Sequence, residues 1–105
     1  MGNGETLELL RALVRDRNWD QFHTPENLAK SISIEAAELL ECYQWGEADI
    51  AKVRDELADV ITYCLLLTNK LGLDLDEIVQ QKLQKTAAKY PVDKAWGSSK
   101  KYDEL

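Results

Sequence analysis

Apolar residues recur at spacings of three and four along most of the chain, from Leu7 to Ala87. This is the period of one buried face of an α-helix, whereas a half-buried strand would alternate with a period of two. The expected helices span residues 5–18, 25–44, 47–71 and 75–90. The sequence therefore predicts an all-α fold, a four-helix bundle forming a single domain over residues 1–105. After the fourth helix we expect an extended or partly disordered polar tail over residues 92–105.

The third expected helix is apolar almost all the way round between Val60 and Leu67. A helix on the surface of a monomer normally keeps one polar face, so such a segment has to be covered on every side. Four helices in a chain of 105 residues would struggle to cover it. We therefore expect a homo-oligomer, either a dimer or a tetramer built as a dimer of dimers.

The net charge of −6 comes from one segment, because residues 35–59 hold eight acids and two bases while the rest of the chain is neutral. Nucleic-acid polymers and anionic membranes are bound mainly through Lys and Arg, so the overall acidity argues against both partners. The longest uncharged apolar run, residues 60–67, is far shorter than the roughly 20 residues that span a bilayer. We also expect no leader segment, because the given sequence does not open with a charged and then apolar stretch. We expect a soluble, cytoplasmic protein.

Two pairs of carboxylates, Glu35 with Glu38 and Glu56 with Asp59, each lie one helical turn apart on successive helices. The short connection at residues 45–47 makes these helices an antiparallel hairpin, with the pairs mirrored about position 47. Four carboxylates can then converge. Each like-charge contact at about 4 Å costs roughly 4 kcal/mol at an effective dielectric constant near 20, so a cation should neutralise them. All-oxygen ligation favours Mg²⁺ as the cofactor.

Two other interpretations of the acidic pairs compete with the magnesium site. A di-iron centre requires Glu-x-x-His motifs on its helices, and the single histidine, His23, precedes the second helix and forms no such motif. The acids could also form a solvated surface seam with contacts to Lys52 or Arg54. The mirrored spacing favours the metal site over this second interpretation.

Taken together, three segments resemble the MazG-like all-α nucleoside triphosphate pyrophosphohydrolases, whose signature is E-x-x-E followed by E-x-x-D. They are Ile34–Glu41, Asp55–Tyr63 and Lys89-Tyr90-Pro91. Within that family the chain is most similar to the dCTP pyrophosphatase branch. Residues 17–27, 44–45 and 98–105 carry this closer resemblance, which therefore spans nearly the whole chain.

The resemblance implies hydrolysis of a deoxynucleoside triphosphate, dCTP-like or modified, to the monophosphate and pyrophosphate, as a house-cleaning enzyme of the nucleotide pool. Glu35, Glu38, Glu56 and Asp59 would hold Mg²⁺ and form the catalytic centre. The residues implied in substrate binding are Trp19, His23, Trp45, Tyr63, Lys82, Thr86, Tyr90, Lys100, Lys101 and Tyr102. Thr86 stands where the family commonly has Asn, which bears on the contact to sugar or phosphate.

Each of these assignments has a structural competitor. Trp19 and Trp45 could be packing residues at helix ends, and His23 could be a loop or cap residue. Lys82 could be a solvated helix charge, and Tyr63 could belong to an oligomer core. For the whole protein, the alternatives are the same fold with another base preference (dATP, dUTP or phosphoribosyl-ATP) or a non-catalytic helical interaction module.

Overall fold

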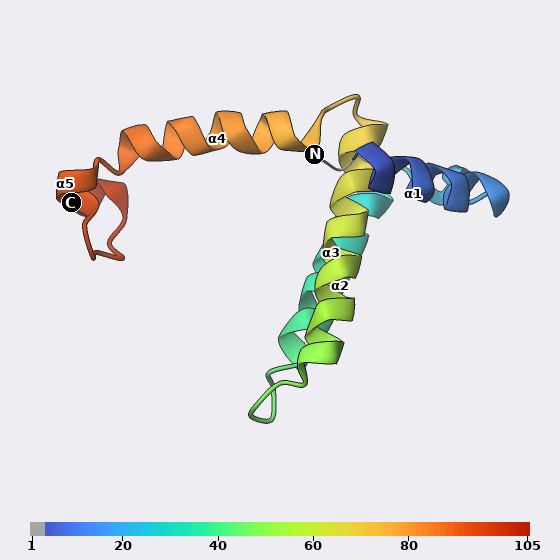
Figure 1. Cartoon of the computed structure of the whole chain (residues 1–105), viewed down its shortest axis with the longest axis horizontal. Coiled ribbons are helices and arrows are strands. Elements are labelled where there is room, and N and C mark those ends of the chain that lie inside the picture. The colour runs from blue at the N-terminus through green and yellow to red at the C-terminus, as the bar shows by residue number, and fades with distance from the viewer. Residues whose placement is uncertain (1–3) are drawn as a thin grey trace. The chain divides into compact units, whose positions relative to one another are not determined.

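The computed structural model describes residues 4–105, so the first three residues of the expected domain lie outside the described residues. Helices account for all the regular secondary structure of this range, which confirms the all-α class (Figure 1). The elements are α1 (Gly4–Asp16), η1 (Asp20–Phe22), α2 (Pro25–Glu41), α3 (Ile50–Lys70), α4 (Leu75–Lys89), α5 (Val92–Ala95) and η2 (Tyr102–Glu104), where η denotes a 3₁₀ turn. None of the helices within residues 4–105 is long and apolar enough to cross a bilayer.

Three helices begin at a residue whose side chain accepts a hydrogen bond from the first turn. Thr24 accepts from the backbone nitrogen of Asn27 at 3.1 Å, with Pro25 at the first helical position. Asp74 accepts from the backbone nitrogen of Glu77 at 2.9 Å. Thr and Asp are suited to these positions, because their side-chain oxygens satisfy backbone donors that a helix start leaves free.

The connection between α2 and α3 is longer than expected. After Glu41 the chain continues as turns whose backbone hydrogen bonds join residues three apart. In one of them the backbone nitrogen of Tyr43 donates to the carbonyl oxygen of Leu40 at 3.0 Å. Gly46 has a φ of 120°, a conformation that side-chain-bearing residues rarely adopt. Asp49 then caps α3, because its side-chain Oδ1 accepts a hydrogen bond from the backbone nitrogen of Ala51 at 3.0 Å. Both helices of the hairpin are therefore shorter next to the loop than the expected helices, which spanned residues 25–44 and 47–71.

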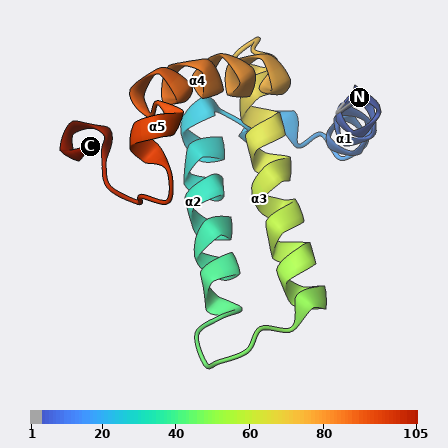
Figure 2. The same ribbon diagram turned by 60° about the vertical axis from the view of Figure 1, so that its left-hand side comes forward.

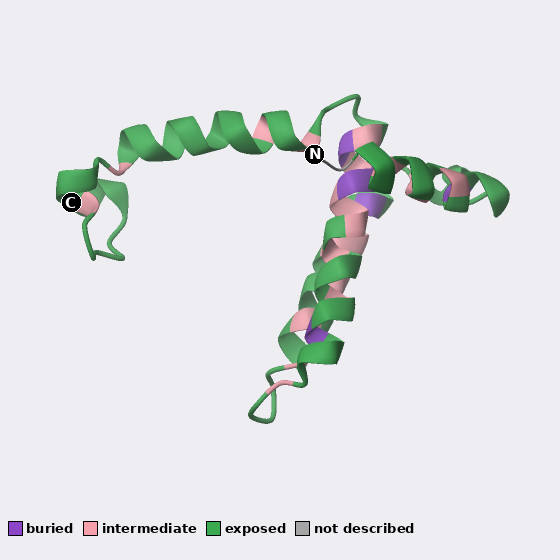
Figure 3. Cartoon of the chain, viewed as in Figure 1, coloured by how far each residue is buried: buried purple, intermediate pink, exposed green. Residues whose placement is uncertain are grey.

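The chain forms two compact units, one up to Leu73 and one from Asp74 onward. In the first unit α2 and α3 run antiparallel and side by side, as both ribbon views show (Figures 1 and 2). The small buried core joins Val14 of α1, Leu28 of α2 and Leu66 of α3 (Figure 3). The core therefore lies where α1 packs on the end of the hairpin that is away from the α2–α3 loop.

The second unit contains α4, α5 and η2. Its last 14 residues were expected to be extended or partly disordered, and this is wrong in two places, because Val92–Ala95 forms one helical turn and Tyr102–Glu104 a 3₁₀ turn. Pro91 sits at the N-cap of α5, where its missing N–H costs no hydrogen bond. Gly97, with a φ of 66°, follows the end of this turn.

Candidate active site

The four carboxylates of the mirrored pairs come together between α2 and α3. One ligand oxygen from each of Glu35, Glu38, Glu56 and Asp59 lies within 4.8 Å of all the others. Each helix supplies two of them from successive turns of the same face, and the antiparallel packing of α2 on α3 brings the pairs level. The spacing of the acids in the sequence predicts this convergence.

Two members of the cluster are partly withdrawn from water. Glu35 and Glu56 are half-buried, whereas Glu38 and Asp59 are exposed. The Oε2 atoms of Glu35 and Glu56 are buried and have no hydrogen-bond partner. Buried oxygens of this kind normally have a partner, so these two positions call for a ligand.

The pKa values of the same two groups are shifted upward. A hydrogen bond with Glu38, then burial and the charges of Glu38, Asp59 and Glu56, raise the pKa of Glu35 to about 7. Burial first, and then a hydrogen bond with Glu38, raise the pKa of Glu56. The cluster therefore holds more negative charge than its surroundings neutralise, and a hard divalent cation with oxygen ligands fits it.

An open acidic hollow adjoins the cluster on the side of the α2–α3 loop. It encloses about 570 Å³. Its lining consists of Glu38, Glu41, Cys42, Glu47, Asp49, Lys52 and Glu56. Lys52 is the single cation in this lining, so a polyanion entering here would need metal ions to offset the acids.

A smaller cavity of about 110 Å³ has Asp59 in its lining. Trp19, His23 and Tyr63 line it together with Asp59, so these three predicted substrate-binding residues do lie beside a predicted metal ligand. The Nδ1 atom of His23 is buried and has no hydrogen-bond partner. A mostly apolar lining with one unpaired polar atom has the composition that small-molecule sites have.

The same cavity has walls that the sequence interpretation did not include. Leu10 and Leu13 of α1 and Thr62 of α3 also line it. The periodicity placed the two leucines in a buried stripe, yet the exposed fraction of Leu13 is 41%. Thr62 could have been noticed, because it is a polar residue within an otherwise apolar stretch of α3.

Trp45 is not among the residues that line this cavity. It lies in the loop between α2 and α3, and 90% of its surface is exposed. Such exposure is unusual for Trp, and it excludes the packing role that was considered for this residue within the first unit.

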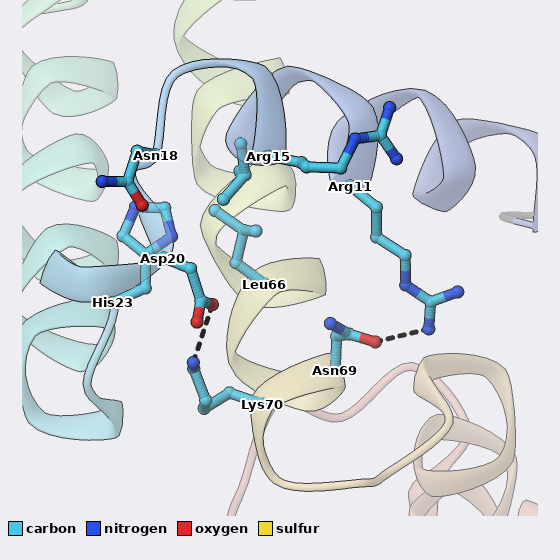
Figure 4. Close-up of a pocket in the computed structure, with 9 residues that line it drawn as sticks. Arg11, Arg15, Asn18, Asp20, His23, Leu66, Asn69 and Lys70 are labelled. Atoms are coloured by element: carbon cyan, nitrogen blue, oxygen red, sulfur yellow. Dashed lines mark hydrogen bonds and ion pairs between the residues drawn. The ribbon is translucent and has the colours of Figure 1, made fainter.

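A separate cavity of about 300 Å³ lies behind His23, between α1, η1 and the end of α3 (Figure 4). It has three cations, but each of them is already paired. Arg11 donates to Glu8 at 2.7 Å and to Asn69 at 2.6 Å, and Lys70 donates to Asp20 at 2.8 Å. Arg15 lies 3.4 Å from Asp16. This pairing makes the cavity a poor site for a triphosphate.

The remaining predicted substrate-binding residues belong to the second unit. Lys82, Thr86, Lys100 and Lys101 are exposed there, and Tyr90 is half-buried. The rings of Tyr90 and Tyr102 meet edge to face with their centres 6.2 Å apart. The ammonium group of Lys89 lies 4.8 Å from the centre of the Tyr102 ring. The tail is thus attached to the end of α4 by aromatic and cation–π contacts.

Comparison with known proteins gives consistent matches. The sequence model of the MazG-like family matches residues 30–105. The dCTP pyrophosphatase 1 of Homo sapiens is 36% identical over 95% of this chain and 68% of its own length, and that of Mus musculus is 33% identical over the same shares. The crystal structure of a pyrophosphatase from Archaeoglobus fulgidus is 40% identical, with a TM-score of 0.78 over 83% of this chain and 90% of that one.

The family match covers well over half of the chain, and it includes all four clustered carboxylates. The archaeal pyrophosphatase, which is similar in both fold and sequence, agrees with that match. The chain therefore belongs to the MazG-like family of all-α nucleoside triphosphate pyrophosphohydrolases.

Proposed function

We propose that this protein hydrolyses deoxynucleoside triphosphates, dCTP or modified dCTP-like nucleotides, to the monophosphate and pyrophosphate, with Mg²⁺ as its cofactor. The observation that carries the proposal is the convergence of four carboxylate oxygens within 4.8 Å, two of whose carboxylates also have a buried, unpartnered oxygen. The names of the relatives from four mammals support dCTP as the substrate class. A non-catalytic interaction module would have no need of such a cluster.

Glu35, Glu38, Glu56 and Asp59 would hold the metal. When bound, divalent cations would offset the charge of the triphosphate and lower the pKa of a water molecule. A carboxylate oxygen of the cluster that is not engaged by metal accepts the proton of the attacking water. The water oxygen bonds to the α-phosphorus as the bond from that phosphorus to the bridging oxygen breaks, and pyrophosphate leaves.

The nucleoside would occupy the cavity beside Asp59. Trp19 and Tyr63 offer aromatic faces for the base and the sugar, and the unpartnered Nδ1 of His23 offers a hydrogen bond. Trp45 would close on the base from the loop. Six residues of the second unit would contact the phosphates, as the resemblance implies: Lys82, Thr86, Tyr90, Lys100, Lys101 and Tyr102.

The proposal includes self-association. Leu57 and Ile61, two apolar residues one turn apart on α3, have exposed fractions of 47% and 46%. A second copy covering this face would remove the apolar surface from water, which favours a dimer or a dimer of dimers. A role in cleaning the nucleotide pool would place the enzyme in the cytoplasm.

The direct test is pyrophosphate release from a panel of nucleoside triphosphates in Mg²⁺ buffer. We expect the highest kcat/KM for dCTP or a base-modified dCTP, with lower values for dATP, dUTP and ribonucleotides. Glu56→Gln should abolish the release. Activity that persists in Glu56→Gln, or no release from any member of the panel, would overturn the proposal.

A further inference from the structure

The segment from Trp19 to His23 leaves α1 abruptly. Asn18 adopts a left-handed φ of 54°, and the backbone nitrogen of Trp19 donates to the carbonyl of Val14 at 3.0 Å. The chain then makes the single turn η1 and enters α2. Both ends of this short segment, Trp19 and His23, line the cavity beside Asp59. The position of the segment therefore sets the width of that cavity.

One face of α3 lies along this segment. Asp59, Tyr63, Leu66 and Lys70 are spaced by four, three and four residues, so they form one row about three turns long. The first three of them line the cavity. Lys70 ends the row, and its Nζ donates a hydrogen bond to Oδ1 of Asp20 at 2.8 Å (Figure 4). Asp20 lies within the segment, between the two cavity residues.

This ion pair is the polar link between the segment and α3. Of the side-chain hydrogen bonds and ion pairs found in residues 4–105, the Lys70–Asp20 pair alone joins residues 19–23 to that helix. On the opposite side, Asn27 of α2 donates to the carbonyl of Phe22 at 3.0 Å. The segment is thus tied to each helix of the hairpin by one side chain.

We propose that Lys70 is a positioning residue, which acts through Asp20 to hold Trp19 and His23 against the face of α3 that carries Asp59. The ion pair would fix the separation between the nucleoside pocket and the metal-binding carboxylates. This inference rests on the proposed function for its effect on catalysis, but its structural part stands without it. Lys70 makes no contact with the cavity, so it is distinct from the residues that touch the substrate.

The pair is charged and solvent-accessible. The hydrogen bond and the charge of Lys70, with a further contribution from His23, lower the pKa of Asp20. The exposed side-chain fractions are 31% for Lys70 and 73% for Asp20. Ion pairs in such surroundings contribute little to the stability of the whole fold. Breaking this one should therefore loosen the segment without unfolding the protein, and this separates positioning from a merely structural role.

The kinetic test compares Lys70→Met, which keeps the length of the side chain and removes its charge, with Lys30→Met as a matched control. Lys30 is an exposed cation of α2 and forms none of the ion pairs seen in the described residues. We expect Lys70→Met to raise KM roughly two- to fivefold with kcat and Tm nearly unchanged, and Lys30→Met to change none of them. The exchanged pair, Lys70→Asp with Asp20→Lys, should recover part of the loss.

A second readout needs no activity. In a background with Trp45→Phe and Trp96→Phe, both highly exposed positions, Trp19 is the only tryptophan. Acrylamide should quench its fluorescence more strongly after Lys70→Met and after Asp20→Asn, and no more in the double variant than in either single one. Unchanged quenching in these variants would overturn the positioning role, even if the protein released pyrophosphate from no nucleotide. Additive effects of the two substitutions would also overturn it.

Discussion

Glu38 of α2 and Glu56 of α3 present carboxylate oxygens within 4.8 Å of each other. Oxygens of Glu35 and Asp59 lie within the same distance of both. The neighbouring carboxylate of Glu38 helps to raise the pKa of both Glu35 and Glu56. Glu38 therefore affects the protonation of a carboxylate on each of the two helices, so its substitution should reveal most about the cluster.

We expect Glu38→Gln to weaken Mg²⁺ binding and to reduce pyrophosphate release by more than roughly 100-fold, because the amide keeps the shape of the side chain but loses a charged oxygen ligand. Isothermal titration with Mg²⁺ measures the first effect without any nucleotide. Glu26→Gln, at an exposed position in the first turn of α2, serves as the control. Equal Mg²⁺ affinity in the Glu38 and Glu26 variants would contradict metal binding at the cluster.

The raised pKa values predict how stability depends on pH when metal is absent. The pKa of Glu35 is about 7 in the folded state against 4.5 in the unfolded state, so the folded protein binds more protons between these values. The free energy of unfolding should therefore fall as the pH rises from about 4.5 to about 7. Glu56 acts in the same direction. Urea unfolding in EDTA, at several pH values across this range, measures the slope.

Two controls accompany this pH series. Glu35→Gln cannot titrate at this position, so its stability should fall less steeply with pH than that of the native protein. Added Mg²⁺ should stabilise the protein more at about pH 7.5 than at about pH 5, because metal ligands must be deprotonated. A stability that rises with pH in EDTA would show that the cluster does not hold these protons.

The sequence was sufficient to predict the carboxylate cluster because two short-range rules decide it. Residues three apart share a helix face, and a short connection makes successive helices antiparallel. Neither rule changes when the loop is a few residues longer or shorter. The cluster was therefore predicted correctly although the loop begins after Glu41 and ends at Asp49, and is longer than expected.

The cavity beside Asp59 was harder to predict, because it depends on how a segment without periodicity folds back on α3. Asn18 provides the sharp exit from α1, and Asn adopts the left-handed conformation more readily than most residues, but the sequence alone does not show that it does so here. The resemblance to the family supplied Trp19 and His23, whereas Leu10, Leu13 and Thr62 required the structure. The turns α5 and η2 were missed because a polar composition was taken to indicate disorder.

Trp45 offers a test of substrate binding that is separate from stability. Because 90% of its surface is exposed, Trp45→Ala should leave Tm unchanged. If its ring stacks on the base, KM should rise roughly tenfold, since stacking on one base contributes about 1–3 kcal/mol. Trp96→Ala is the matched control, with 85% of its surface exposed and no proposed contact with the substrate. Equal KM values for the two variants would remove Trp45 from the nucleoside site.

The apolar face of α3 predicts the effect of a charge on assembly. Leu57, Ile61 and Leu65 line a shallow hollow on this face, and a lysine at position 61 would place a charge in any interface formed there. We expect Ile61→Lys to lower the molar mass measured by light scattering towards that of a monomer, 12.0 kDa. Ala29→Lys, at an exposed position of α2, should leave the mass unchanged. A native protein that is already monomeric at micromolar concentration, or an Ile61→Lys variant with the native mass, would show that this face is not the one that a second copy covers.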